Sequence, residues 1–296
     1  MKSKKLKKWT TLLTCATALT VMTACSQSSS QSTGTTSSTT SKTSAVTATT
    51  SKKTNKNNSN YFTSKDSDTS YDESSASKIK LSGSSADVSG DGVAVSGSTV
   101  TISKAGTYVI SGKSDGVQIK VDAGDSDDVH IVLDGVTMTN TNAAINATSA
   151  GHVYLTLKDG TTSTLSDSSS NSDEDADAVI FSKGDLTING SGTLNIDAKK
   201  NNGIKANDSL HMTGGTLNVE VGQGDTDPID SNGDIIVSGG TINLTGQSGF
   251  DFDGSATYTG GDITINGEKQ TKIENSMPGG GGPQGGGQPG GFGGGH

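Results

Sequence analysis

The chain is 296 residues long, carries a formal net charge of −9 and contains only 29% hydrophobic residues. All 22 of its basic residues are lysine, and from Lys78 to Glu274 they are outnumbered by acidic residues, 12 against 27. A region this acidic excludes nucleic-acid binding through neutralised phosphates, and an anionic partner would need a bridging cation.

The first 24 residues have the features of a secretory signal peptide. A cluster of lysines from Lys2 to Lys8 precedes an apolar stretch, Thr10 to Met22, that is too short and too polar to span a membrane. The residues from Met22 to Cys25 resemble the lipobox of bacterial lipoproteins, which implies acylation of Cys25 and a lipid anchor at the extracellular face of the cell membrane. The alternative is an ordinary secretory signal with an incidental cysteine. Cys15 lies in the segment that would be removed, so no disulfide is expected in the mature chain.

Two segments have compositions typical of disorder. Residues 25–77 consist mainly of Ser, Thr, Lys and Asn, which predicts a solvated tether with too little apolar surface to fold. Residues 275–296 are mostly Gly with Pro and Gln, which predicts a second disordered segment. One domain, residues 78–274, remains between them.

Short apolar runs recur through this domain at a nearly fixed spacing. Runs beginning at Leu186, Leu210 and Ile235 step by 24 and 25 residues, and each is followed by a Gly-Thr-(Leu/Ile)-Asn run. A further apolar column runs Val93, Val117, Ile145, Val179, Ile204, Ile229 and Phe250, with a polar loop, Ser166 to Asp175, inserted in its longest step. A period near 24 that holds about three short strands indicates one coil of a parallel β-solenoid. We therefore predict an all-β fold, a right-handed single-stranded parallel β-helix.

Carboxylates gather around the end of the last column. Aligned coils place Lys205, Asp230 and Asp251 at equivalent positions. Adjacent coils lie about 4.8 Å apart, so two carboxylates there would repel by on the order of 3 kcal/mol at an effective dielectric near 20. A raised pKa or a bound cation would relieve this repulsion.

Calcium suits such a row, because it takes six to eight oxygen ligands in irregular geometry. The predicted calcium ligands are Asp225, Asp227, Asp230, Asp251 and Asp253, with a second candidate group at Asp175 and Asp177. The predicted ligand-binding residues beside them are Lys205, Asn202, Asn232 and Tyr258. The alternative for both acidic groups is a solvated surface without a metal.

The run Ile180–Gly192, the Gly-Gly-Thr-(Leu/Ile)-Asn repeats and the Gly-rich end of the chain resemble a family of bacterial surface lipoproteins. These are carbohydrate-binding β-helices, similar in fold to pectate lyases. The resemblance implies binding of acidic plant polysaccharide such as polygalacturonate, and of cellulose, with calcium bound to the helix.

An enzyme is the less favoured interpretation. A lyase on this fold needs a base; the chain has no arginine, and the acids around Lys205 would keep that lysine protonated. The run Asp225–Asp230 resembles the first motif of β-helix polygalacturonases, whose remaining motifs are missing here. His130, His152 and His211 show no metal or triad spacing and are expected to be surface or packing residues.

The preferred hypothesis is therefore a non-catalytic binder of acidic polysaccharide at the cell surface. A calcium-dependent lyase with Lys205 as its base is one alternative. A structural adhesin or spacer without a glycan ligand is the other.

Overall fold

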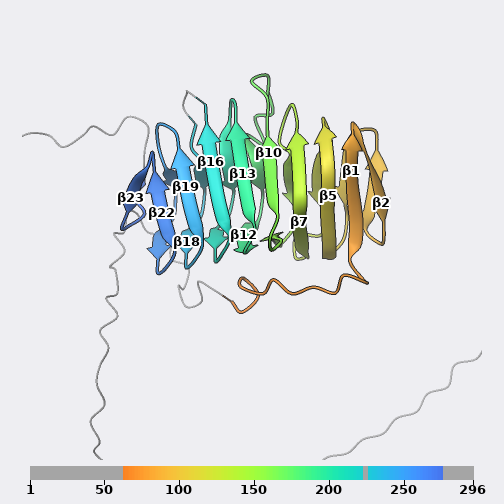
Figure 1. Ribbon diagram of the computed structural model, residues 1–296, viewed down its shortest axis with the longest axis horizontal. Helices are drawn as coiled ribbons and strands as arrows, with labels where there is room; N and C mark the ends of the chain where they lie inside the picture. The colour runs from red at the N-terminus through yellow and green to blue at the C-terminus, as the bar shows by residue number, and fades with distance from the viewer. Residues whose placement is uncertain (1–62, 223–225, 276–296) are drawn as a thin grey trace, which may run out of the picture. The chain divides into compact units, whose positions relative to one another are not determined.

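The computed structural model describes residues 63–222 and 226–275, which lie in one compact unit. These residues form 23 strands in a 15-stranded and an 8-stranded sheet, and none of them is helical (Figure 1). The all-β prediction is therefore confirmed for this part of the chain. No helix capable of crossing a membrane was found among the described residues.

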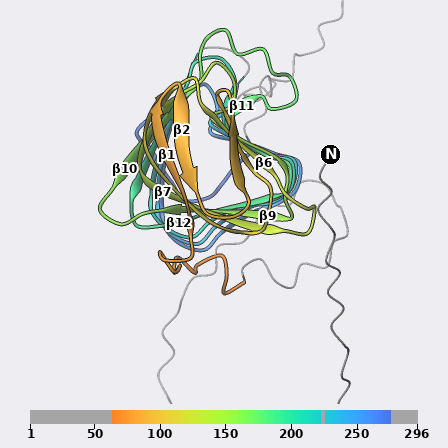
Figure 2. The same ribbon diagram turned by 90° about the vertical axis from the view of Figure 1, so that its right-hand side faces the viewer.

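Most strands belong to three parallel ladders, and from β8 (Ile145–Ser149) to β19 (Thr241–Thr245) each strand pairs with the strand three places further along the chain (Figure 2). The first ladder contains β9 (His152–Leu157), β12 (Asp185–Gly190), β15 (Leu210–Met212), β18 (Ile235–Val237) and β21 (Ala256–Tyr258). The second contains β10 (Thr162–Ser166), β13 (Thr193–Ala198), β16 (Thr216–Val221), β19 (Thr241–Thr245) and β22 (Asp262–Ile265). The third contains β4 (Thr99–Ile102), β6 (Gln118–Asp122), β8 (Ile145–Ser149), β11 (Ala178–Ser182), β14 (Asn202–Ala206), β17 (Ile229–Ser231) and β20 (Phe250–Phe252).

Long strands and antiparallel pairs complete the two sheets. The first and second ladders both join β7 (Asp128–Thr139), which pairs in parallel with β5 (Gly106–Asp115), and β5 pairs in parallel with β1 (Ser77–Gly83). Antiparallel partners are added by β2 (Ser85–Ser89) on β1, β3 (Val93–Ser96) on β4 and β23 (Glu268–Gln270) on β22. These hairpin strands lie at the ends of the ladders, where they cover edges that would otherwise offer free backbone groups to another chain.

The repeat predicted from the sequence is confirmed in its later part. Leu186 pairs with Leu210 and Leu210 with Ile235, while Ile204 pairs with Ile229 and Ile229 with Phe250. Their side chains are inward-facing members of one large apolar core. The predicted insertion is also confirmed as a loop, between the end of β10 at Ser166 and the start of β11 at Ala178.

The earlier members of the predicted column are shifted. Ile145 pairs with Ile180 and Ile119, one and two residues away from the predicted Val179 and Val117. Every residue of β11 is buried, because Ala178 and Phe181 pack in a small second cluster outside the main core. A strand that is buried on both faces has no polar alternation to define its register, so the apolar pattern misplaced it. Val93 lies in β3, which is antiparallel to β4 and so outside the parallel ladder.

The corners between ladders use glycine where the backbone requires it. Gly190, the last residue of β12, has φ +100°, and a Cβ there would lie 2.2 Å from the carbonyl oxygen of Leu157 on the neighbouring repeat. Only a residue without a Cβ fits this close approach.

Residues 63–76, which we call the strap, cross the first ladder before β1 begins (orange in Figure 1). Asp66 of the strap is only 1% exposed, and its backbone carbonyl accepts hydrogen bonds from Asn189 and Thr213. Tyr71 packs against Ala76, Val109 and Val132. This differs from the expected tether over residues 25–77, because a few specific contacts hold a segment whose average composition is polar. Residues 25–62, and the expected tail from 276 onward, lie outside the described residues.

Candidate functional site

The predicted acidic row lies on the third ladder as expected. Lys205, Asp230 and Asp251 occupy one register position on β14, β17 and β20. The ammonium nitrogen of Lys205 lies 3.0 Å from a carboxylate oxygen of Asp230 and 3.1 Å from one of Asp177, in the loop before β11. The side chains of Lys205 and Asp230 are 19% and 13% exposed, so this ion pair is largely shielded from water. A lysine therefore stands among the carboxylates that the sequence assigned to a metal.

The charges of this row act on one another. Burial raises the pKa of Asp230, the neighbouring carboxylates of Asp251 and Asp177 raise it further, and Lys205 opposes them. Burial lowers the pKa of Lys205, but the hydrogen bonds and charges of Asp230 and Asp177 outweigh it and raise that pKa above its usual value. At neutral pH the lysine is therefore a cation, and it faces a row with more carboxylates than it can neutralise.

Hydrogen bonds connect two further residues, Asn202 and Asp227, to this site. Asn202 donates a side-chain hydrogen bond of 3.1 Å to Asp230, and its amide oxygen accepts the backbone N–H of Asp227 at 2.8 Å. The Asp227 carboxylate, with the residue 6% exposed, accepts a short hydrogen bond from the hydroxyl of Ser248. Asn202 thus orients Asp230 and connects two consecutive repeats.

The other predicted residues are placed less centrally. Asn232 and Asp253 follow β17 and β20 at the exposed end of the row, where Asn232 makes a long 3.4 Å contact to Asn207. Asp175 is exposed in the loop before β11. Tyr258 lies on β21 of the first ladder, away from the acidic row, and donates to the carbonyl of Gly261. Asp225 and Cys25 lie outside the described residues.

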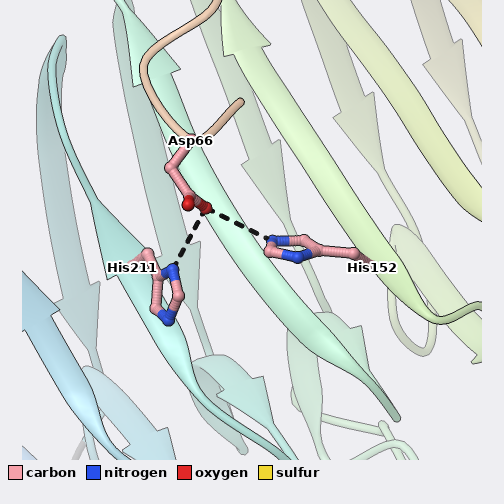
Figure 3. Close-up of side chains that lie close together, drawn as sticks. All are labelled: Asp66, His152 and His211. Atoms are coloured by element: carbon pink, nitrogen blue, oxygen red, sulfur yellow. Dashed lines mark hydrogen bonds and ion pairs between the residues drawn. The ribbon is translucent and has the colours of Figure 1, made fainter. Parts of the chain in front are cut away.

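A second cluster, Asp66, His152 and His211, was missed by the sequence analysis (Figure 3). One carboxylate oxygen, Oδ1 of Asp66, lies 3.1 Å from Nδ1 of His211 and 3.7 Å from Nε2 of His152. The two histidines were expected to be unrelated surface or packing residues, but β9 and β15 present them on either side of β12, beneath the strap. Extending the repeat alignment to β9 would have placed Tyr154, Thr187 and His211 in one column, but nothing in the repeat points to Asp66.

Hydrogen bonds organise this cluster. The hydroxyl of Thr187 donates to Asp66 Oδ1 at 2.6 Å and lies 2.7 Å from Nε2 of His152. Burial tends to raise the pKa of Asp66, but hydrogen bonds from His211, Thr187 and Thr63 prevail and hold it well below its usual range. Burial lowers the pKa of His152. At neutral pH the cluster therefore combines an ionised carboxylate with a neutral imidazole.

A cavity of about 470 Å³ adjoins this cluster at the strap. Its lining includes Lys65, Asp68, Asp128, His130 and Tyr154. The ring of Tyr154 stacks on His152 at 4.0 Å, and the ammonium of Lys65 lies 4.9 Å from the centre of the same ring. Burial raises the pKa of Tyr154, with nearby carboxylates adding to the effect. This cavity thus offers an aromatic ring and both signs of charge.

A third polar surface follows the outward face of the second ladder. Asn195, Asn218 and Asn243 are aligned on β13, β16 and β19. The side-chain amide of Asn218 donates to Oδ1 of Asn195, and that of Asn243 donates to Oδ1 of Asn218, both at 2.8 Å. Thr264 on β22 continues the row by donating to Asn243 at 2.8 Å. A groove of about 410 Å³ lies over these strands. We call this row the asparagine ladder.

Comparisons with known proteins indicate similarity to carbohydrate-binding proteins. The profile of a family described as carbohydrate-binding domain-containing protein matches residues 96–277. A protein with that description from Acetivibrio thermocellus (strain ATCC 27405) is 40% identical over 124 residues, which cover 40% of this chain and 43% of the relative. The aligned region thus spans less than half of that relative. A solved structure of a polysaccharide lyase-like protein from C. thermocellum, a gadolinium derivative, has a TM-score of 0.58 and 32% identity over 64% of this chain and 82% of that protein.

Proposed function

The chain belongs to the family of carbohydrate-binding domain-containing proteins, and from that premise we propose that it binds an acidic polysaccharide through calcium ions held along the third ladder, without cleaving the glycan. The observation that carries this proposal is the pairing of Asp230 with Asp251 on adjacent strands, with Asp177 close by and Lys205 as the cation between them.

We infer further that the three ladders form a right-handed single-stranded parallel β-helix. From β8 onward each repeat contributes one strand to each ladder, so the chain returns to its starting face after three strands. Parallel crossovers of this kind are right-handed in nearly all proteins. In such a helix equivalent side chains recur about every 4.8 Å, which gives an extended polymer a periodic surface to bind.

Charge supports an anionic glycan held through a cation. The acidic row retains negative charge after pairing with Lys205, so it would repel a uronate polymer on direct contact. Calcium takes several carboxylate, carbonyl and water oxygens at once, and it can share them between the protein and a sugar carboxylate.

The state of Lys205 supports binding without catalysis. A lyase base must be free of its proton at working pH, and the pKa of Lys205 is raised by Asp230 and Asp177. The solved relative is described only as lyase-like.

We propose the same surface location as the lipobox resemblance implies, with Cys25 as the lipid anchor on the extracellular side of the membrane.

A second candidate is binding of a neutral polysaccharide such as cellulose along the asparagine ladder. Its amides recur on three consecutive strands beside a groove, and they carry no charge. Amide groups at a regular spacing can pair with the hydroxyls of an extended glucan.

The test is calorimetric titration of the metal-stripped full chain with calcium, and then with polygalacturonate in the presence and absence of calcium. We expect calcium to switch on polygalacturonate binding, and the double substitution Asp230→Asn with Asp251→Asn to weaken it at least tenfold. Asn218→Ala is the matched control, because it alters another face and should leave this binding unchanged.

Three results would count against the proposal. Polygalacturonate binding that ignores both calcium and the double substitution would remove the acidic row from the site. Binding of cello-oligosaccharides, lost in Asn218→Ala and retained in the double variant, would favour the asparagine ladder. Accumulation of unsaturated uronate product would show a lyase.

A further inference from the structure

The cluster of Asp66, His152 and His211 has no role in the proposed glycan site. It lies on the first ladder, and the acidic row lies on the third. Among residues 63–222 and 226–275, these three side chains form the group of His, Cys, Asp or Glu residues whose ligand atoms all lie within 4.8 Å of one another. We propose that they bind a transition-metal ion of the zinc type, which fastens the strap to the first ladder.

The distances fit a metal centre. A tetrahedral zinc ion with bonds of about 2.1 Å holds its ligand atoms about 3.4 Å apart. Asp66 Oδ1 lies 3.1 Å from His211 Nδ1 and 3.7 Å from His152 Nε2, on either side of that value. Figure 3 shows both rings turned toward the carboxylate. Shifts of a few tenths of an ångström would bring both of these distances to the coordination value, and the ligand nitrogens of the two histidines lie within 4.8 Å of each other.

The side chains are also held in place as ligands. The exposed fractions are 1% for Asp66, 13% for His152 and 12% for His211. The second carboxylate oxygen of Asp66 accepts the N–H and the hydroxyl of Thr63, which leaves Oδ1 facing the histidines. Thr187 donates to Oδ1, and the stacked ring of Tyr154 limits the rotation of His152. Such supporting contacts are what orient ligands in metal sites.

The donor set selects the class of metal. Two imidazole nitrogens and one carboxylate oxygen suit zinc, cobalt, nickel or copper, while calcium prefers a larger set of oxygens. Three protein ligands leave a fourth position for water. This site should therefore discriminate against the calcium that we assign to the third ladder.

The position of Asp66 gives the ion a structural effect. His152 and His211 belong to the sheet, and Asp66 belongs to the strap, so coordination joins two parts of the chain that are far apart in sequence. Because binding would favour the docked strap over a released one, metal should protect the strap. The alternative is a metal-free cluster stabilised by hydrogen bonds alone.

The test is calorimetric titration of the metal-stripped full chain with zinc, with cobalt as a spectroscopic substitute. We expect one equivalent of zinc to bind and an excess of calcium not to displace it. Asp66→Asn and His211→Gln should each lower zinc affinity more than tenfold. The matched controls are His130→Gln, a histidine on β7 outside the cluster, and His296→Gln, the last residue of the chain.

A structural readout accompanies the titration. Lys65 lies in the strap next to Asp66, so trypsin cleavage after Lys65 reports strap release. Zinc should slow this cleavage at least severalfold in the wild type and not in Asp66→Asn, a variant that leaves the sheet residues intact. Absence of zinc uptake, full uptake by Asp66→Asn, or loss of uptake in His296→Gln would overturn the proposal.

Discussion

Lys205 and Asp230 lie side by side on β14 and β17, and the lysine ammonium is 3.0 Å from the carboxylate. The same nitrogen reaches Asp177 at 3.1 Å, so one side chain bridges two carboxylates from different parts of the chain. A protein side chain therefore occupies part of the space in which the sequence analysis placed a metal. Replacing Lys205 therefore tests whether a metal cation can bind in the acidic row in place of the lysine ammonium.

The substitution Lys205→Met should destabilise the fold, because it leaves partly buried carboxylates without their cation. Breaking a fully buried pair costs about 3–5 kcal/mol; with the side chains 19% and 13% exposed, we expect a loss of about 1–3 kcal/mol. Calcium should restore more stability to this variant than to the wild type, since the vacated position can accept an ion. Urea unfolding with and without calcium measures both effects.

The control for this substitution is Lys199→Met. Lys199 pairs with Asp197 on the second ladder, and its side chain is 53% exposed. Exposed pairs contribute about 1 kcal/mol or less, so little loss and no calcium response are expected. An equal calcium response in both variants would contradict a specific cation position in the acidic row.

Gly190→Ala should destabilise the protein far more than Gly160→Ala. Both glycines have positive φ, +100° and +67°, so both substitutions incur the strain of about 1–2 kcal/mol of a left-handed backbone. At Gly190 the new methyl group would also lie 2.2 Å from a backbone oxygen of Leu157, while at Gly160 it meets nothing within 4 Å. Thermal unfolding of the two variants should separate them clearly, and similar midpoints would mean that the corner can relax.

Stability should fall as the pH drops below about 6.5. Burial lowers the pKa of His130 below its usual value; Asp68 opposes this shift, and Lys65 adds to it. Between the lowered folded pKa and the unfolded value of about 6.5, the unfolded chain binds more protons, so acid favours unfolding. The burial of His152 acts in the same direction.

The substitution His130→Gln should reduce this pH dependence. The measurement compares unfolding midpoints at about pH 7.5 and about pH 5.5 in the wild type and the variant. A smaller decrease is expected for the variant, because one of the two histidines no longer titrates. If the midpoint falls as much in the variant as in the wild type, then His130 accepts a proton as readily in the folded protein as in the unfolded chain.

Asn218→Ala should weaken the second ladder. Asn218 donates to Asn195 and accepts from Asn243, both at 2.8 Å, so its removal deletes two hydrogen bonds and leaves two partners unsatisfied. We expect a loss of about 1–3 kcal/mol in urea unfolding. Asn207→Ala is the control: Asn207 is exposed, its contact with Asn232 is 3.4 Å long, and a change within about 0.5 kcal/mol is expected.

The repeat and the acidic row could be predicted because both follow from regular spacing. Ile204, Ile229 and Phe250 step through the sequence at nearly the period of one repeat, so aligning them also aligned Lys205, Asp230 and Asp251. The composition did not reveal that Lys205 would point at both Asp177 and Asp230, because that depends on where the loop before β11 returns to the ladder.

The sequence by itself determined the all-β class, the strand repeat and the polarity of the third ladder, since apolar side chains at a fixed period must face one core. The register of β11 and the course of the strap were decided by tertiary structure. β11 is buried on both faces, and Asp66 meets His152 and His211 only because the strap docks across the ladder. Contacts between neighbouring repeats recur with the period of the sequence and can therefore be predicted from it. A contact that is made once, by a polar segment outside the repeat, produces no periodic pattern and cannot be predicted in this way.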